Sequence, residues 1–299
     1  MPEIKARVVE IHSSGLNSDG KLNSNEAAKM LQTGLDNLSP TGMGEDLLEK
    51  LFPPRETIGL KVNALAGRAM STAPELAYAF GEICARLGRK KNEIIFWDRH
   101  EAELVRAGYS IKAAGSDYLC FATDTVGVGF SQHLHTRNNV SSLFSKIQVE
   151  LAQSTVNFPI LKDHSIAGLS GCLKNNYGLI HNPNKYHENC CDPYLADLYG
   201  MELVKGKQKL AIMDATRIQI NGGPAYVKRW AMNYNSILLA TDALALDRVA
   251  YAILDRLRTK SGLMGLKESG REPAAIATAE KQGLGCADLK RIEWIVVNI

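Results

Sequence analysis

The segment from Asn157 to Asp192 carries most of the side chains in this 299-residue chain that could perform chemistry. It begins in an apolar run typical of a buried strand and continues through a passage rich in glycine and serine. Its ionisable and amide side chains include Lys162, Asp163, His164, Lys174, Asn175, His181, His187, Cys190 and Cys191. Imidazoles, thiols and charges gather behind a buried strand where a protein binds something. The segment therefore predicts a functional site.

Proton transfer beside a carboxylate is the chemistry that this set of side chains fits best. Such a reaction needs a base whose pKa lies near neutrality and positive charges that hold the substrate. We expect His164, Lys174 and Asp98 to be the catalytic residues, with His164 moving the proton. Lys162 and Arg99 would neutralise the substrate, a small oxygen-rich anion such as a hydroxy acid or a related carboxylate.

Polar residues follow five predicted strands at the point where each strand ends. These residues include Asn63, Asp98, Lys162, Asp214 and the pair Thr241–Asp242. Ligands of open α/β sheets bind outside the carboxyl ends of the strands, so we expect these groups at one rim of the sheet. The predicted substrate-binding residues are Lys162, Arg99, Asn175, Lys61 and Asn63. Asp and Asn after a strand also form turns or cap helices, and for Asp242 the capping role is equally well founded.

A divalent metal ion is one candidate cofactor. The predicted ligands are His187, His181, Asp214 and Asp242. A second arrangement combines the two histidines with Cys190, Cys191 and Asp192, a mixed donor set of nitrogen, sulfur and oxygen. The spacing matches no zinc signature, and the chain has no C-x-x-C pair and therefore no iron–sulfur motif.

Composition and motifs exclude several classes of partner. The net charge is +3 with both signs interspersed, which gives no nucleic-acid footprint. The glycine passages match neither G-x-x-x-x-G-K-[ST] nor a G-x-G-x-x-G after a strand, so nucleotide binding of those kinds is not expected. No apolar run is long enough to span a membrane, and no signal peptide precedes Arg7. We expect a soluble cytoplasmic protein, or an exported one if a leader was removed upstream of residue 1, in an oligomeric state that the sequence leaves open.

Short aliphatic runs that alternate with helical patterns predict an α/β fold with a largely parallel sheet flanked by helices. Strands are expected at residues 8–11, 57–62, 93–97, 156–161, 210–213, 237–240 and 292–297, and helices at 24–38, 72–87, 101–107, 243–257 and 273–282. Residues 1–299 are expected to form a single domain with an inserted irregular region at about 110–150. Within that region His133 and His135 would face the same way on a strand, which suits a metal ion.

Capping residues mark the ends of two predicted helices. Asn23 or Ser24 should cap the first helix, and Thr72 or Ser71 the second. Gly88 should follow the C-terminus of the second helix, because glycine adopts the left-handed conformation that ends many helices.

The chain resembles the domain-of-unknown-function family 362. Five stretches carry this resemblance: IGLKVNALAG, IIFWDRHEAELVRAGY, NFPILKDHSIAGLSGCLKNNYGLIHNP, the Asp214 strand with Gly222–Gly223–Pro224, and TDALALDRVA. Together they span residues 57–250. Some members of the family carry iron–sulfur ferredoxin modules or begin with a twin-arginine export leader, and neither feature is present in this chain.

A weaker resemblance points to the nickel-pincer lactate racemase superfamily. In that group a glycine-rich passage separates a histidine from a lysine that holds the cofactor, and a second histidine follows as a metal ligand. His164, Lys174 and His187 occur here in the same order. The resemblance implies proton transfer by His164, cofactor or substrate binding by Lys174, and metal binding by His187.

Three functions therefore remain open at the level of sequence. The first is an enzyme that moves a proton on a small anion, racemase-like or metal-assisted. The second is a non-catalytic metal or redox accessory protein whose ligands are the histidines and cysteines of residues 181–191. The third is a structural subunit of a larger assembly that uses residues 110–139 as its contact surface.

Overall fold

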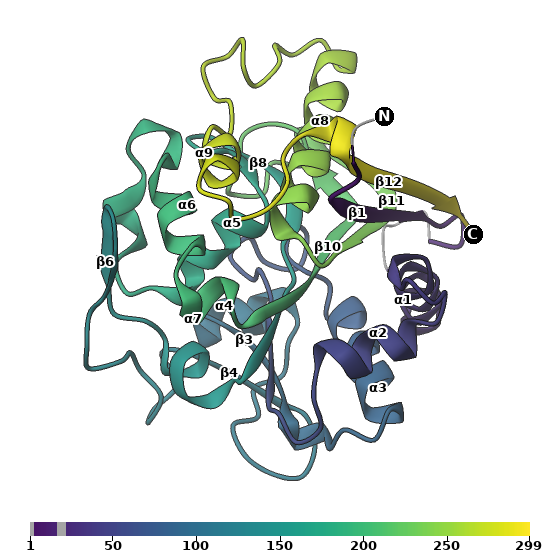
Figure 1. The fold of residues 1–299 in the computed structure, drawn as a ribbon, viewed down its shortest axis with the longest axis vertical. Helices are drawn as coiled ribbons and strands as arrows, with labels where there is room; N and C mark the ends of the chain where they lie inside the picture. Colours follow the sequence, from purple (N-terminus) through teal and green to yellow (C-terminus); the bar gives the residue numbers. More distant parts are fainter. Residues whose placement is uncertain (1–2, 17–21) are drawn as a thin grey trace.

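Ten strands form one sheet in the computed structural model, which describes residues 3–16 and 22–299 (Figure 1). In chain order they are β1 (Ala6–His12), β2 (Ile58–Lys61), β3 (Ile94–Asp98), β4 (Leu119–Ala122), β7 (Ser154–Asn157), β8 (Ile160–His164), β9 (Gly168–Ser170), β10 (Gln208–Gln219), β11 (Ala231–Ala240) and β12 (Ile292–Asn298). Their order across the sheet is β12-β1-β11-β10-β7-β2-β3-β4, with β8 beside β10 and β9 beside β8.

Most neighbouring strands in this sheet are parallel. β7, β2, β3 and β4 run parallel to one another, and both β7 and β8 run parallel to β10. The antiparallel pairs are β1 with β11, β10 with β11, and β8 with β9. The predicted α/β fold with a mostly parallel sheet is confirmed. Because β11 runs against β10, the carboxyl end of β11 lies at the opposite rim, and the expectation that all five strands end at one rim is wrong for β11.

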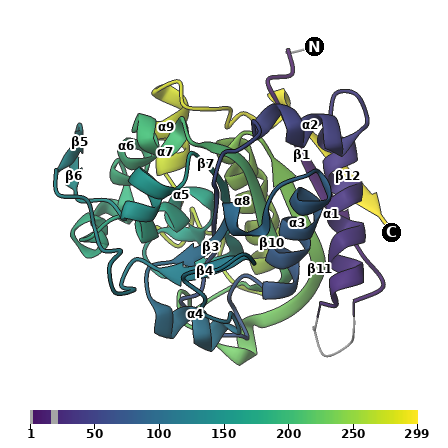
Figure 2. The same ribbon diagram turned by 90° about the horizontal axis from the view of Figure 1, so that it is seen from below.

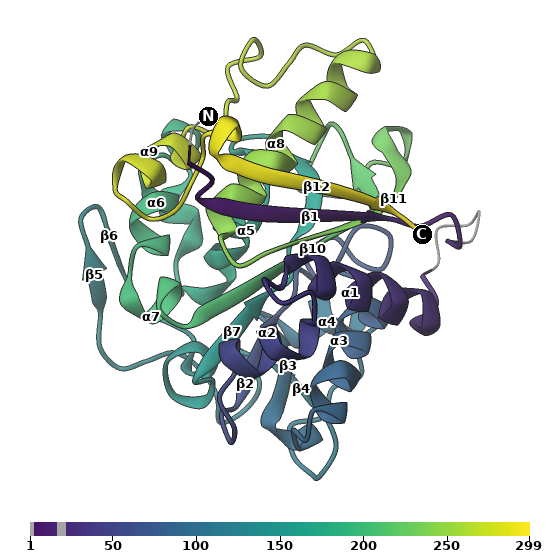
Figure 3. The ribbon, with the colours of Figure 1, turned by 45° about the vertical axis from the view of Figure 1, so that its right-hand side comes forward.

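Helices cover both faces of the sheet (Figure 3). On one face lie α1 (Ser24–Leu38), α2 (Gly44–Leu51), α3 (Pro74–Arg86) and α4 (Glu101–Ala107), and on the other lie α5 (Cys172–Asn175), α6 (Tyr194–Tyr199), α7 (Glu202–Lys205), α8 (Ala243–Lys260) and α9 (Ala275–Lys281). Within the described ranges no helix has both the length and the apolar character that a membrane crossing needs.

Side-chain alternation along the strands divides the buried residues between two hydrophobic cores. In β3, Ile94 and Phe96 pack with α1, α2 and α3, whereas Ile95 and Trp97 pack on the opposite face with α5, α6 and α8. A strand that is buried on both faces needs an almost continuous apolar run. This requirement explains why strands such as β3 are evident from the sequence.

The predicted helix ends are confirmed in two places and wrong in one. The Asn23 side chain accepts a hydrogen bond from the Glu26 amide at 2.8 Å and caps α1, and Gly88, at φ +86°, follows α3. Thr72 and Ser71 do not cap α3, which begins after Ala73. The Thr72 hydroxyl instead donates to the Phe158 carbonyl oxygen at 2.6 Å and accepts from the Asn63 amide at 2.9 Å.

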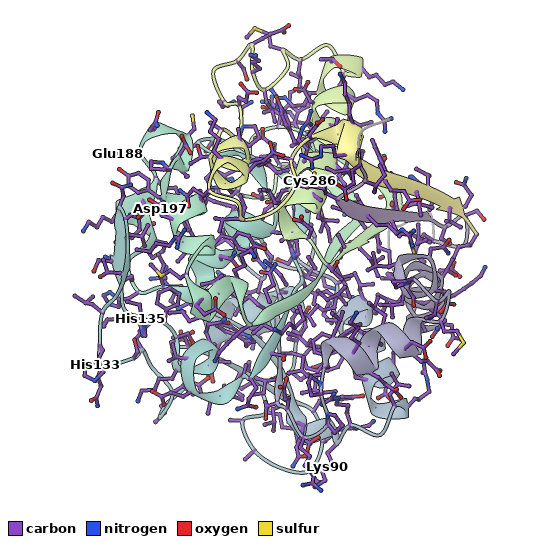
Figure 4. The ribbon with its side chains drawn as sticks, viewed as in Figure 1. Lys90, His133, His135, Glu188, Asp197 and Cys286 are labelled. Carbon is purple, nitrogen blue, oxygen red and sulfur yellow. The ribbon has the colours of Figure 1, made fainter. Side chains whose placement is uncertain are left out.

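The region that the sequence indicates as irregular contributes to the main sheet. β4 pairs with β3 at the edge of the sheet, and its four residues are too few to give a recognisable pattern. β5 (His135–Arg137) and β6 (Val140–Ser142) form a hairpin at the margin of the molecule (Figure 2). His133 and His135 lie at the same margin (Figure 4), where the His135 ring packs edge-on against Phe144 with 5.4 Å between ring centroids.

Candidate functional site

A pocket of about 250 Å³ lies at the carboxyl ends of β2, β3 and β8. The predicted site residues that line it are Lys61, Asn63, Asp98, Arg99, Lys162, His164, Lys174, Asn175 and His187. The segments that supply them are separated by up to about two fifths of the chain. The structure therefore brings most of the predicted site together, and His181, Asp214 and Asp242 are the predicted residues that lie outside the lining.

Strand β8 directs two alternate polar side chains into the pocket. The side chain of the residue between them points away from the pocket. Successive side chains of a strand point to opposite faces, so Lys162 and His164 both reach the pocket. Asp163 points to the other side and is fully buried there, where its carboxylate meets the guanidinium groups of Arg258 at 3.2 Å and Arg271 at 2.9 Å. The three polar residues 162–164 thus contribute to two different features. Two of them line the pocket, and the third belongs to a structural ion cluster on the opposite side of the strand.

Lys162 is a buried amine that has no carboxylate partner among the described residues. Its side chain is about 1% exposed, and the contact recorded for its Nζ is to the neutral Oδ1 of Asn63 at 3.5 Å. Burial, and after it the positive charge of Lys174, lowers the pKa of Lys162 to about 8. Both effects disfavour the ammonium form.

Lys174 approaches the same pocket from the short helix α5. Its Nζ lies 4.3 Å from the centroid of the Tyr177 ring, a cation–π contact that favours the charged amine. Burial lowers the pKa of Lys174 to about 8, the same value as for Lys162. Two depressed lysine pKa values in one pocket indicate positive charges that the protein itself leaves without a neutralising partner.

Helix α5 is held in place by a carboxylate on α8. Asp247 is buried and accepts hydrogen bonds from the backbone amides of Cys172 at 2.6 Å and Leu173 at 2.9 Å, and burial raises its pKa to about 6. A Cβ atom on Gly171 would lie 2.2 Å from Asp247 Oδ1, so this position requires glycine. The absence of a side chain at Gly171 therefore admits a carboxylate of the protein itself.

We expect Gly171→Ala to destabilise the fold by about 1–3 kcal/mol, the usual penalty for overpacking a tight contact. The added methyl group would push Asp247 away from the amides at the start of α5. Urea unfolding measures this change, and binding of a small carboxylate should weaken in parallel because Lys174 moves with α5. An unchanged unfolding midpoint would show that α5 tolerates the added group.

Lys61 and Asp98 form a buried ion pair at the floor of the pocket, with Nζ and Oδ1 2.7 Å apart. Asp98 also accepts hydrogen bonds from the amides of Ala64 at 2.7 Å and Arg99 at 2.8 Å. With its oxygens occupied by three donors, Asp98 fits a positioning role better than the predicted catalytic one. Gly178 packs against this pair, since a Cβ there would lie 2.7 Å from Lys61 Nζ.

A chain of amide groups ties the loop after β2 to α5. Asn175 Oδ1 accepts from Asn63 Nδ2 at 3.2 Å and from Lys61 Nζ at 3.4 Å, and its Nδ2 donates to Asn157 Oδ1 at 2.7 Å. Asn175 is buried and its side chain is used by these contacts. It orients Lys61 and Asn63, so direct substrate contact is not the role that the geometry suggests for it.

His164 is held in one neutral tautomer. Its Nδ1 accepts hydrogen bonds from the backbone amides of Ile166 and Ala167, each at 3.2 Å, so the ring proton lies on Nε2. Burial, followed by the charge of Lys174, lowers the pKa of His164 to about 2. A ring of this kind donates a hydrogen bond through Nε2 and lacks the near-neutral pKa that the predicted base requires.

His187 has the complementary tautomer. Its Nδ1 lies 3.0 Å from the carbonyl oxygen of Pro183, which can only accept, so Nδ1 carries the proton and Nε2 keeps its lone pair. The ring stacks on His164 with 5.8 Å between centroids and meets the Tyr177 ring edge-on at 5.2 Å. Burial and then the charge of Lys174 lower the pKa of His187, which keeps this imidazole unprotonated near neutrality.

Arg99 joins the pocket to the loop that follows helix α5. One guanidinium nitrogen donates to the carbonyl oxygen of His181 at 2.8 Å, and the Nε atom is buried without a partner in the described part of the chain. The His181 side chain itself is exposed and packs edge-on against Phe130 at 5.1 Å between centroids. This side chain does not face the pocket. His181 therefore contributes to the site through its backbone carbonyl group.

Asp214 and Asp242 lie outside the pocket lining: Asp214 is buried within a strand, and Asp242 is a half-buried helix cap. Asp214 sits within β10, beyond the end predicted for that strand, and accepts from the Ala73 amide at 2.9 Å and the Thr216 hydroxyl at 2.7 Å. Asp242 begins α8 at the opposite rim and accepts from the amides of Leu244 at 2.9 Å and Cys286 at 2.9 Å. Burial raises the pKa of both carboxyl groups.

The predicted metal ligands do not converge. In residues 3–16 and 22–299 no three side chains of His, Cys, Asp or Glu come close enough together to hold a metal ion. The thiol of Cys190 lies 3.5 Å from the Gly270 carbonyl oxygen, while Cys191 is buried near Lys174 and Tyr177.

Sequence reasoning missed two ionisable groups of the lining, Glu103 and Tyr177. Burial, and then the charge of Asp98, raises the pKa of Glu103 above its ordinary value. Glu103 lies in the first turn of α4, directly after β3. Because few residues separate it from the end of the strand, the sequence did contain a signal that its side chain could reach the rim of the sheet. Tyr177 gave no such signal, because an aromatic residue after Lys174 is equally typical of a buried core.

The family described as "Domain of unknown function (DUF362)" matches residues 58–252. Among solved structures, a Thermotoga maritima protein determined by a structural genomics consortium is similar at a TM-score of 0.43 and 11% sequence identity, over 80% of this chain and 59% of that one. This chain thus spans 59% of the length of that protein. No curated protein matches the sequence. The family match covers most of the 299 residues and includes the strands β2, β3 and β8 that form the pocket, and the chain therefore belongs to the DUF362 family.

Proposed function

We propose that this protein is an enzyme that binds a small carboxylate in the pocket and moves a proton on it. The observation that carries the proposal is a pair of amines, that of Lys162, which is buried, and that of Lys174, which is half-buried. Both line one pocket without carboxylate partners among the described residues. Buried charges are normally paired. A bound anion would supply the missing pairing, because its carboxylate oxygens accept hydrogen bonds from both ammonium groups.

The pocket volume favours a small substrate. A water molecule occupies about 30 Å³ in the liquid, so a cavity of about 250 Å³ holds the equivalent of about eight water molecules. This is below the usual range for drug-sized ligands. A hydroxy acid or related carboxylate of a few carbon atoms fits this space.

The two histidine tautomers support a division of roles. His187 presents an unprotonated Nε2 and is our candidate for the base that removes a proton from the carbon beside the carboxylate. His164 presents an Nε2–H, which would stabilise negative charge that develops on a substrate oxygen. Glu103, whose pKa is raised by burial, is the candidate acid. The resemblance to lactate racemases involves His164, Lys174 and His187, and we place the proton-moving role on His187.

Proton exchange tests this proposal directly. L-lactate in deuterated water should lose the NMR signal of its C2 proton in the presence of the protein, and His187→Ala should abolish this loss while lactate still binds. His181→Ala is the matched control, because that imidazole is exposed and outside the pocket. The assay should be run with and without added divalent metal, which also tests a metal-assisted reaction. Binding without exchange on any small hydroxy acid or oxo acid would contradict the catalytic proposal.

Anion binding should weaken as the pH rises through about 8. Lys162 and Lys174 both have pKa values of about 8, so they lose their positive charges above this pH, while the carboxylate of the ligand stays charged. Below pH 8 both charges are present, and affinity should stay high until the carboxyl group of the ligand is protonated. Calorimetric titration with lactate from pH 6 to pH 10 measures this dependence. Equal affinity at pH 7 and pH 10 would contradict it.

A further inference from the structure

The three lysines of the pocket have different surroundings. Lys61 is neutralised by Asp98 at 2.7 Å, and the ammonium of Lys174 lies over the Tyr177 ring at 4.3 Å. Among the residues that the structure describes, the hydrogen-bond partner of Lys162 Nζ is the neutral amide oxygen of Asn63, at 3.5 Å. Of these amines, Lys162 therefore gains the least from being charged.

The position of Lys162 also suits a nucleophile. A desolvated amine beside a second cationic group reacts readily with carbonyl carbons, because the free amine is populated near neutrality. Lys162 meets both conditions, since it is buried and the charge of Lys174 lowers its pKa further. Strand β8 holds the side chain rigidly on the pocket side, next to His164. A rigid strand fixes the amine better than a loop would.

We propose that Lys162 forms an imine with the carbonyl carbon of a small 2-oxo acid whose carboxylate is bound by Lys174. This inference rests on the proposed function, because it uses the same anion pocket, and it adds a covalent step and a substrate class. Lys61 takes no part in the step, since Asp98 holds its ammonium group.

The step balances without an oxidant or a reductant. The lone pair of Lys162 Nζ forms a bond to the carbonyl carbon, and the π electrons of the C=O bond move to oxygen. Nitrogen then gives one of its two protons to this oxygen. The nitrogen lone pair expels the resulting hydroxyl group, which leaves as water with a second proton from the Glu103 carboxyl group. The products are a protonated imine, one water molecule and the Glu103 carboxylate. The positive charge of the protonated imine acidifies the neighbouring C3–H bond, which the unprotonated Nε2 of His187 can then attack.

Reductive trapping tests the inference. The whole protein is incubated with pyruvate and sodium borohydride, and the product is examined by intact mass and by peptide mapping. We expect one reduced pyruvate per chain, located on Lys162. Lys162→Arg should abolish trapping and still bind pyruvate by calorimetry, because arginine keeps the charge and cannot form the imine. The matched control Lys185→Arg, at an exposed lysine, should be labelled like the unmodified protein.

The outcomes separate the two proposals. Pyruvate that binds without a borohydride-dependent adduct overturns the imine and leaves the anion site intact. An adduct on Lys174, or label spread over surface lysines, also overturns the assignment to Lys162. Absence of pyruvate binding overturns the imine, and if lactate also fails to bind, the proposed function is overturned as well. Should Lys162→Arg fail to fold, the peptide map of the unmodified protein decides the question by itself.

Discussion

Lys174→Met weakens the binding of a small carboxylate by about 30-fold or more and leaves the protein folded. Truncating one partner of a buried charge pair removes about 2–5 kcal/mol of binding free energy. Lys174 is one of only two lining amines that lack a carboxylate partner within the described structure, so no other group replaces it. Calorimetry with lactate and with pyruvate measures the loss. Lys185→Met is the control, because this lysine is exposed and should leave both affinities unchanged.

The same substitution should raise the stability of the unliganded protein at pH 7. Because the pKa of Lys174 in the folded chain is about 8, below its ordinary value of 10.5, the folded state holds this proton less strongly than the unfolded state. The burial of Lys174 therefore destabilises the fold below pH 8, and this penalty disappears as the pH rises from about 8 to 10.5. We expect a gain of about 1–3 kcal/mol at pH 7, measured by urea unfolding.

If Lys174→Met raised the stability of the protein and weakened carboxylate binding, Lys174 would be identified as a functional residue. A substitution that damaged the fold would lower both quantities together. If Lys174→Met bound lactate as tightly as the unmodified protein, the anion site would have to lie elsewhere and the proposed function would be wrong.

Asp163→Ala should destabilise the protein by about 3–5 kcal/mol, because it leaves buried positive charge without its partner. The Asp163 carboxylate accepts from Arg258 and Arg271 and from the Gly223 amide at 3.1 Å. Burial raises the pKa of Asp163 in spite of both guanidinium groups, so the cluster fixes positions more than it adds net electrostatic stability. Its removal is nevertheless severe, since Arg258 is buried and cannot turn to water.

Urea unfolding measures the effect, with Glu82→Ala as the control. Glu82 pairs with Lys91 at 2.8 Å on the surface, where such pairs contribute about 0–1 kcal/mol. Because Asp163 lies between Lys162 and His164 on β8, carboxylate binding should weaken together with stability. If Asp163→Ala lowered the free energy of unfolding by less than Glu82→Ala does, the two arginines would have found other acceptors.

Much of the architecture could be predicted from the sequence. Buried parallel strands need continuous apolar runs, and β3 stands out for that reason. The apolar run at 156–161, predicted as one strand, is divided between β7 and β8, and the last three residues of β8 are polar or charged. Polar residues at the carboxyl ends of the predicted strands indicated a shared rim, and the pocket contains those that belong to β2, β3 and β8. The reversal of β11 was not accessible, because a short apolar run has the same pattern in either direction. That reversal separates Asp242 from the pocket.

The residue types of the site were determined by the sequence, and their roles were decided by the tertiary structure. Lys162, His164, Lys174 and His187 could be named from one segment because ionisable groups rarely accumulate beside buried strands. Which nitrogen of His164 carries the proton depends on two backbone amides, and the pKa of Lys162 depends on burial and on an amine twelve residues away. Such properties arise from solvent exclusion and from distances across the fold, which a linear pattern of residues does not contain.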